Sequence, residues 1–222
     1  MRFQDAAKDA RAVTYAAIQA EPVVAQAGGL LADASAAQRV MARAVMNGET
    51  LEPDGWRIMF PSLFGEPVEA TDQERSEAIL AVSLAIADRG DQVRNQLRGA
   101  LVEELTAVLL ARRVGASDVR RERRVLFDGV RAEIHPYDVT VERSGAAEAY
   151  DCKWGARGIN ADVLYQLDDA RTNAAAEEEE ALRVALVVFD AELSCQVRLE
   201  RQTAPHDHTR LVSLETLTSL SG

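Results

Sequence analysis

The sequence predicts an α/β fold preceded by a mainly helical N-terminal region. From residue 95 onward, helical and extended patterns follow one another as helix, strand, strand, strand, helix, strand. The run Leu182–Phe189 is short and mostly Val, Ala and Leu, which is typical of a buried strand. The chain has 222 residues, of which 47% are hydrophobic and 27% charged, so it is long enough to bury a core.

The N-terminal third is rich in alanine, and its apolar positions recur near helical spacing at residues 3–20 and 34–47. Residues 49–70 contain several prolines and glycines, which favours a loop with a short extended piece at 56–60. Thr71 and Glu74 fit a capping box that begins another helix, ending near Asp88. We expect residues 1–92 to form a helical accessory region for substrate choice, oligomerisation or partner binding.

Residues 93–222 form the second expected domain. Its first helix is closed by Gly115, and its hairpin turns are expected at Asp128-Gly129 and Ser144-Gly145. In chain order, the expected elements are a helix at 95–114, strands at 119–127, 130–141 and 149–154, a helix at 161–180, strands at 182–189 and 194–199, and a helix at 211–220.

Composition excludes several classes of protein. The two cysteines, Cys152 and Cys195, cannot form a disulfide framework, which favours a reducing compartment. The longest apolar stretch, Ala78–Ala87, is too short to span a bilayer, and the N-terminus lacks the apolar core of a signal peptide. We therefore expect a cytoplasmic protein that does not associate with a membrane.

The net charge is −11, which disfavours a polyanionic partner, but the charge is unevenly distributed. Residues 1–90 carry −5, residues 91–160 carry +1 and residues 161–222 carry −7. A local basic patch can steer a polyanion toward an acidic protein. The alternative is a solvated charged surface without a partner. The basic cluster comprises Arg112, Arg113, Arg120, Arg121, Arg123 and Arg124, and of these Arg120, Arg121 and Arg123 are the candidate substrate-binding residues.

Two carboxylates and an ammonium group are expected to converge on the predicted sheet. Alternation along each strand gives Asp151 and Lys153 a common face. If the two strands pair across the Ser144-Gly145 turn, Asp138 lies near both. Clustering these charges is costly unless a cation neutralises the carboxylates, and oxygen ligands of this kind suit Mg²⁺ or Mn²⁺.

The motifs Pro136-Tyr137-Asp138 and Asp151-Cys152-Lys153 resemble those of the PD-(D/E)xK nuclease superfamily, which has the restriction-endonuclease-like fold. In pattern the chain is nearest to the branches similar to Holliday-junction resolvases and Mrr. Two departures are visible: one residue separates the proline from the first aspartate, and the second motif begins with Asp rather than the commoner Glu. The resemblance implies a mixed sheet flanked by helices.

The resemblance also implies a set of functional residues. Asp138, Asp151 and the backbone carbonyl of Cys152 would hold Mg²⁺ or Mn²⁺. Lys153 would orient a water molecule, help to deprotonate it, or stabilise charge on the phosphate. Glu103, with Glu104 as the alternative, would approach the metal from the preceding helix.

The helix that follows Lys153 contains Gln166, which similar nucleases direct toward a phosphate or a water near the metal. A plain surface glutamine is an equal alternative at this position.

We therefore expect a metal-dependent nuclease, with DNA favoured over RNA as its substrate. Restriction, phage defence and repair are the cellular roles that the resemblance implies. A homodimer is expected by analogy with the superfamily, and residues 1–92 could bind a partner protein. Two alternatives stay open, namely an RNase on the same fold and a non-catalytic scaffold subunit of a nucleic-acid-processing complex.

Overall fold

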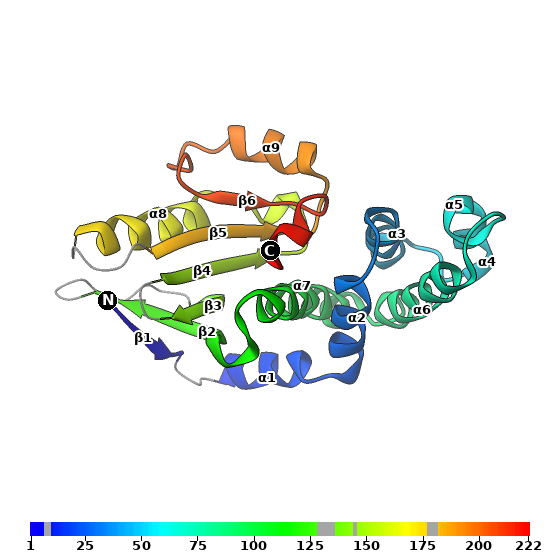
Figure 1. Cartoon of the computed structure of the whole chain (residues 1–222), viewed down its shortest axis with the longest axis horizontal. Helices are drawn as coiled ribbons and strands as arrows, with labels where there is room; N and C mark the ends of the chain where they lie inside the picture. Colours follow the sequence, from blue (N-terminus) through cyan, green and yellow to red (C-terminus); the bar gives the residue numbers. More distant parts are fainter. Residues whose placement is uncertain (7–9, 128–135, 144–145, 177–181) are drawn as a thin grey trace. The chain divides into compact units, whose positions relative to one another are not determined.

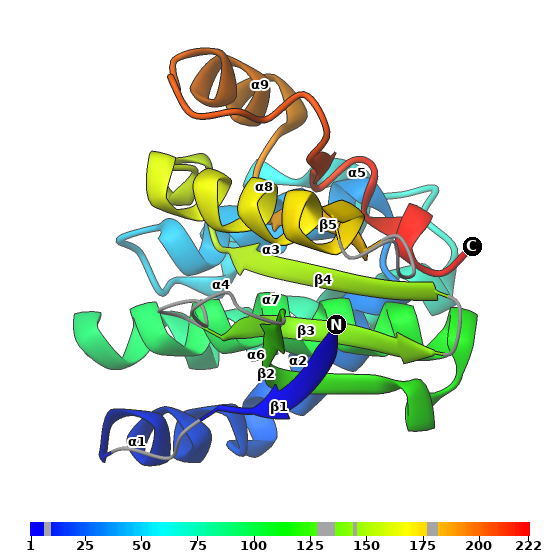
Figure 2. The same cartoon turned by 90° about the vertical axis from the view of Figure 1, so that its left-hand side faces the viewer.

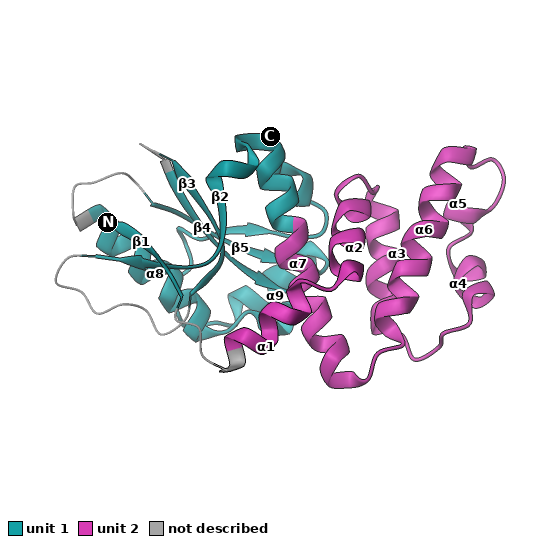
Figure 3. Cartoon of the chain, turned by 90° about the horizontal axis from the view of Figure 1, so that it is seen from below, with its two compact units in different colours: residues 1–9, 106–222 teal, residues 10–105 magenta. Residues whose placement is uncertain are grey.

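The structure is a computed structural model and describes residues 1–6, 10–127, 136–143, 146–176 and 182–222. The chain divides into two compact units, coloured separately in Figure 3. Unit 1 comprises residues 1–9 and 106–222, and unit 2 comprises residues 10–105. The division falls within a continuous helix, whereas the sequence placed a boundary between residues 92 and 93.

Unit 2 consists of helices in the described part of the chain. They are α1 (Ala10–Gln19), α2 (Pro22–Ala32), α3 (Ala36–Asn47), α4 (Pro53–Met59), α5 (Pro61–Phe64), α6 (Ala70–Ala87) and the first part of α7 (Asp91–Val114). α6 packs against α2 and α3 through side chains such as Met41 and Ile79, which are fully buried. α3 begins at a capping box in which Ser35 and Gln38 exchange hydrogen bonds between side chain and backbone.

Two expectations about the N-terminal third are wrong. Residues 3–20 are not one helix, because Arg2–Asp5 form strand β1 before α1 begins. Residues 49–70 are largely helical rather than a loop with an extended piece. α4 and α5 each begin with a proline in the first turn, where the missing N–H would have no partner within the helix. The prolines therefore start helices here.

The described part of unit 1 contains a six-stranded mixed sheet with strand order β1-β2-β3-β4-β5-β6 (Figure 1). Its remaining strands are β2 (Val119–Leu126), β3 (Tyr137–Arg143), β4 (Ala146–Lys153), β5 (Leu182–Val188) and β6 (Arg210–Val212). The first four strands pair antiparallel, whereas β4, β5 and β6 run parallel. The α/β class is confirmed, and the elements from α7 to β5 follow the expected order.

One face of the sheet packs against α8 (Ala161–Ala176), as Figures 1 and 2 show. Leu164 and Leu167 of α8 are fully buried against alternate residues of β4 and β5, including Ala149 and Leu186. Parallel strands need a long crossover connection, usually a helix, and α8 lies between β4 and β5 in the chain. This packing fixes β4, the strand that carries the Asp151-Cys152-Lys153 motif.

Two further expectations near the C-terminus are wrong. Residues 194–199 belong to helix α9 (Glu192–Glu200), because Cys195 and Leu199 are four residues apart and form the inward face of a helical turn. Residues 211–220 are not one helix. They contribute to β6 and to a 3₁₀ turn at Leu217–Leu220.

The predicted turns at Asp128-Gly129 and Ser144-Gly145, and the last residues of the helix expected at 161–180, lie outside the described residues. In the part of the chain that the structure describes, none of the helices combines the length and apolar character that a bilayer-spanning segment needs.

Candidate active site

Asp138 and the Asp151-Cys152-Lys153 motif meet where β3 and β4 pair. The antiparallel register begins with Val139 opposite Tyr150, and Asp138 and Asp151 are the next residues along the two strands. The Cys152 backbone N–H donates a 2.6 Å hydrogen bond to Asp138 Oδ2. The expected convergence of Asp138 with the second motif therefore occurs within unit 1.

Asp151 and Lys153 form an ion pair at the end of β4. Asp151 is only 6% exposed, and its Oδ1 atom is completely buried against the Lys153 ammonium group. Among the described residues this oxygen accepts no other hydrogen bond. A carboxylate oxygen has two lone pairs, so Asp151 retains unused capacity to bind a cation or a donor.

The pKa of Lys153 is raised above its ordinary value. Burial of the ammonium group lowers the pKa, but the negative charges of Asp151 and Asp138 outweigh this effect. Lys153 therefore stays protonated throughout the neutral range. Its Nζ acts as a hydrogen-bond donor and a positive charge rather than as a proton acceptor.

The segment after β4 holds the Lys153 side chain in place. A Cβ atom at Gly158 would lie 2.8–2.9 Å from the Cβ, Cγ and Cδ atoms of Lys153, so the position has room only for glycine. Buried Asp190 accepts hydrogen bonds from the backbone N–H groups of Ala156 (2.9 Å) and Ala191 (2.8 Å). The Phe189 N–H donates to the Lys153 carbonyl at 2.9 Å. These contacts anchor the end of β4 to the end of β5.

Glu122 is a site residue that the sequence analysis missed. It lies on β2 between the pairs Arg121–Val139 and Arg123–Tyr137, which sets it opposite Asp138. Carboxylate oxygens of Glu122 and Asp138 lie within 4.8 Å of each other. The sequence pattern that could have identified Glu122 is its place as the single acid among four arginines, on the strand expected to pair with the strand of Asp138.

The backbone at Glu122 is strained, because its φ angle is +52°, a left-handed conformation that non-glycine residues rarely adopt. Such a conformation costs on the order of 1–3 kcal/mol and is concentrated at functional sites. The Glu122 carboxylate therefore reaches the neighbourhood of Asp138 through a backbone conformation that β-strands normally exclude.

The candidate substrate-binding arginines differ in their surroundings. Arg123 is bound between Glu142 (2.7 Å) and Asp5, and these hydrogen bonds raise the pKa of its guanidinium. Arg120 is exposed and donates to the Val119 carbonyl, and Arg121 is half-buried. Arg123 thus stabilises the β1–β2–β3 region, whereas Arg120 stays accessible to a ligand.

Gln166 is half-buried on α8, and its backbone carbonyl accepts a 3.1 Å hydrogen bond from the Tyr137 hydroxyl. This contact ties the middle of α8 to the beginning of β3, one residue before Asp138. The helix that carries Gln166 is thereby fixed beside the strand that carries the first motif.

Glu103 and Glu104 lie on the part of α7 that belongs to unit 2. Glu103 is 4% exposed and accepts hydrogen bonds from the Tyr15 hydroxyl and from Gln19 Nε2, the latter at 2.7 Å. The half-buried Glu104 side chain packs against Gly28. Both glutamates therefore have partners in unit 2, and Glu103 is the more deeply buried.

The part of α7 in unit 1 packs behind the second motif. Thr106 is completely buried, and the Cys152 thiol lies 3.5 Å from its hydroxyl oxygen. The Cys152 side chain is therefore part of the packing between α7 and β4. Its backbone N–H, in contrast, faces the Asp138 carboxylate.

The described residues of this site contribute three carboxylates, Asp138, Asp151 and Glu122, and one ammonium group, Lys153. At neutral pH the acids outnumber the base, which leaves a net negative charge. Clustered carboxylate oxygens are the ligands that Mg²⁺ and Mn²⁺ prefer. The arrangement can therefore bind a divalent cation next to a fixed positive charge.

No protein-family model and no curated protein matches this sequence. The fold is similar to the crystal structure of protein VC1899 from Vibrio cholerae, with a TM-score of 0.50 and 17% sequence identity. The alignment covers 99% of this chain and 56% of that one, so the chain spans little more than half the length of VC1899. At this level of identity the likeness concerns the fold alone, and it agrees with a mixed α/β architecture.

Proposed function

We propose that the protein is a Mg²⁺-dependent nuclease that hydrolyses phosphodiester bonds in nucleic acid on a restriction-endonuclease-like core. One observation carries the proposal: Asp138 accepts a hydrogen bond from the backbone between Asp151 and Lys153, and Lys153 is paired with Asp151. Three ionised groups of these types are costly to gather on a sheet without a ligand to balance them.

The order of elements supports the same proposal. α7, β2, β3, β4, α8 and β5 follow the order that the sequence patterns predict for the expected restriction-endonuclease-like core, and the two motifs lie on adjacent antiparallel strands. Fold alone does not specify an activity, so the argument depends on the charged groups of the site.

The donor set fits a divalent cation. Asp151 Oδ1 is buried against the Lys153 ammonium group and accepts no other hydrogen bond among the described residues. The close carboxylates of Asp138 and Glu122 repel each other unless a cation or a proton intervenes. Asp138, Asp151, the Cys152 carbonyl and Glu122 would hold the ion. Mg²⁺ or Mn²⁺ bound there would lower the pKa of a water molecule and neutralise charge on the scissile phosphate.

Lys153 would act as a donor in this chemistry. Its raised pKa keeps it charged, so Nζ would orient the attacking water or stabilise a phosphate oxygen as negative charge develops. Gly158 and Asp190 would act as positioning residues, because they restrict the Lys153 side chain and the end of β4.

Glu103 remains part of the proposal as a residue that acts on the metal. It is more deeply buried than Glu104, which stays the alternative.

The proposal is tested by cleavage of supercoiled, linear and single-stranded DNA and of RNA, each with Mg²⁺, Mn²⁺ or EDTA. Replacing Asp138 or Asp151 with Asn, or Lys153 with Met, is expected to lower the rate at least 100-fold, because the aspartates would hold the metal ion and Lys153 would supply positive charge to the reacting phosphate. The control is Asp169→Asn, an exposed acid on the same unit.

Cleavage that requires metal and is lost only in the site variants supports the proposal, and undiminished cleavage by Asp151→Asn contradicts it. We propose DNA as the first substrate, and cleavage of RNA alone would assign an RNase instead. If the wild-type protein cuts nothing and binds no metal, the scaffold alternative is favoured. Light scattering of the same preparation tests the proposed homodimer.

A further inference from the structure

A second polar feature of unit 1 lies away from the carboxylates. It is a cavity of about 400 Å³ between the first residues of β4 and β5 and the beginning of β6. Its lining carries four arginines and one carboxylate, so it is strongly cationic. The charged residues that line it are Arg113, Arg171, Arg183, Arg210 and Glu148.

One wall of the cavity is built from a fixed charge pair. Both terminal nitrogens of Arg113 donate to the Glu148 carboxylate, which also accepts a hydrogen bond from the Tyr150 hydroxyl. Burial raises the pKa of Glu148, but Arg113 and Tyr150 outweigh this effect and the pKa is lowered. Glu148 is therefore ionised and neutralises Arg113.

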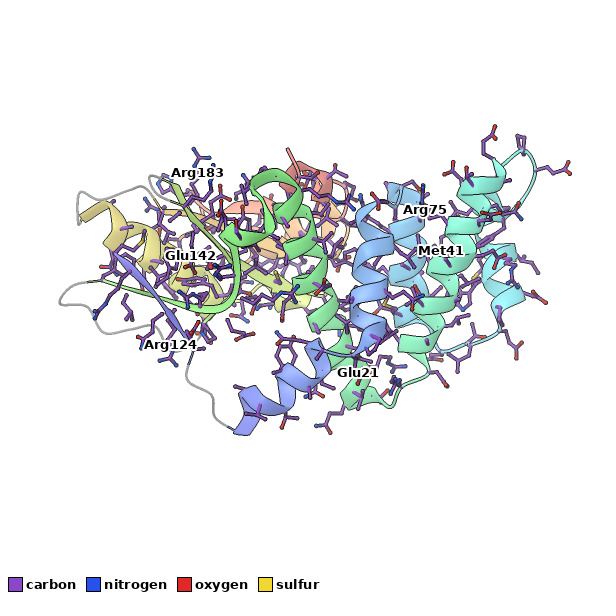
Figure 4. The ribbon with its side chains drawn as sticks, turned by 60° about the horizontal axis from the view of Figure 1, so that its bottom comes forward. Glu21, Met41, Arg75, Arg124, Glu142 and Arg183 are labelled. Carbon is purple, nitrogen blue, oxygen red and sulfur yellow. The ribbon has the colours of Figure 1, made fainter. Side chains whose placement is uncertain are left out.

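The other arginines leave an excess of positive charge. Arg171 is paired with Asp168 at 3.0 Å, outside the cavity lining. Arg210 is held by the Ser219 carbonyl at 3.2 Å, and within the described residues it pairs with no carboxylate. Arg183, labelled in Figure 4, is exposed on β5, and its side chain makes no hydrogen bond to the described residues. Arg183 and Arg210 thus supply positive charge that no described ion pair neutralises.

The backbone adds further donors. β6 pairs with residues Ala185–Val187 of β5, so the preceding residues Leu182–Val184, which line the cavity, have no β6 partner in the described structure. The edge of β5 at these residues, on the side where β6 pairs further along, can offer backbone N–H groups beside the guanidinium groups. Fork-shaped guanidinium donors and backbone N–H groups together are the features that bind phosphate oxygens.

We propose that this cavity binds a phosphate group, presented either by a free nucleotide or by a nucleic-acid strand. Arg183 and Arg210 would contact the phosphate oxygens, while the pair of Arg113 with Glu148 would fix the opposite wall. The volume is enough for a phosphate with an attached sugar. Inorganic phosphate alone should therefore bind more weakly than a nucleoside monophosphate.

The cavity is separate from the carboxylate site. Tyr150 and Asp151 are neighbours on β4 and point to opposite faces of the sheet. Glu148 and Lys153 are five residues apart, which corresponds to about 16 Å along a strand. The proposal does not depend on the nuclease activity, because binding can be measured without a metal ion.

Calorimetric titrations in EDTA test the proposal with three probes: inorganic phosphate, adenosine monophosphate and a 12-nucleotide single-stranded DNA. The full chain is compared with Arg183→Gln and Arg210→Gln, and with Arg201→Gln as a control for an exposed arginine outside the cavity. Thermal melting of each variant confirms that it is folded.

We expect each cavity variant to weaken binding of the monophosphate or the DNA at least tenfold, and the control to bind as the wild type does. Loss of monophosphate binding assigns a nucleotide site, and loss of DNA binding alone assigns a site for a strand. Equal affinity in all variants, or no binding of any probe by the wild type, overturns the proposal. Because EDTA removes the metal, either result is independent of cleavage.

Discussion

Lys153 interacts with the negative charges of both Asp151 and Asp138 in the candidate site. Its raised pKa means that its ionisation stabilises the fold fully below the unfolded pKa of about 10.4, and that this stabilisation is lost only as pH rises through the folded pKa. In the neutral range its charge is therefore constant.

Gly158→Ala tests how tightly Lys153 must be held. The new methyl group would meet the Lys153 stem, so we expect the side chain to move and cleavage to fall at least tenfold. The overpacking should cost about 1–3 kcal/mol of stability. Gly29→Ala, where the added Cβ meets no atom within 4 Å, is the control, and cleavage rates with urea unfolding are the readouts. Full activity in Gly158→Ala would show that the position of Lys153 is not critical.

Glu122 combines a strained backbone with a carboxylate near Asp138. We expect Glu122→Gly to be more stable than Glu122→Ala by about 1 kcal/mol, because glycine adopts a positive φ without strain. Both variants should bind Mn²⁺ more weakly than the wild type. Urea unfolding and Mn²⁺ titration measure the two effects, and equal stability of the variants would refute the strain argument.

Glu148 should give the protein part of its resistance to acid. Its folded pKa is lowered, so its stabilisation is present above the unfolded pKa of about 4.3 and is lost as pH falls through the folded value. Glu148→Gln should therefore be less stable than the wild type by roughly 1–3 kcal/mol at pH 7, with the gap narrowing below about pH 4. A gap that stays constant down to pH 3 in urea titrations would contradict this assignment.

Among the elements, those that form the site were predictable. Hydrophobic alternation predicted the strands that carry residues 137–153, and helical periodicity predicted the helices α7 and α8. The errors arose where local signals have two meanings. Pro53 and Pro61 start helices although proline also breaks them, and the apolar residues of α9 fit either a strand or a helix.

The site was predictable only in part for a related reason. The proximity of Asp138, Asp151 and Lys153 could be predicted from strand alternation and from one expected turn between the two strands. Glu122 depends on a strand register and a positive φ that sequence patterns do not reveal. The cavity brings together Arg113 and Arg183, which are far apart in the sequence.

α3 offers a test at the scale of an element. Ser35→Ala removes the hydroxyl that accepts from the Gln38 N–H, so we expect a loss of about 1 kcal/mol in stability. Ser62→Ala, at an exposed position, is the control. Chemical unfolding of the two variants measures the difference, and identical midpoints would show that this cap contributes nothing.

For the whole molecule, the net charge of −11 constrains how nucleic acid is bound. Binding must depend on local groups such as Arg120 and the cavity arginines against an overall repulsion. We expect weak non-specific affinity, because few phosphates would be neutralised against a repelling background. Neutralising about two phosphates already lowers the affinity about tenfold between 50 and 200 mM salt, so we expect a fall of at least that size. Fluorescence anisotropy with a labelled oligonucleotide measures this dependence, and tight binding that survives high salt would contradict it.

The most direct test of the account is a Mn²⁺ titration of the wild-type protein, Asp151→Asn and Asp169→Asn, followed by electron paramagnetic resonance. The account predicts that the wild type and Asp169→Asn bind the ion alike and that Asp151→Asn binds it at least tenfold more weakly. Equal binding by all three proteins would show that Asp151 does not hold the ion, and the proposed metal site would lose its basis.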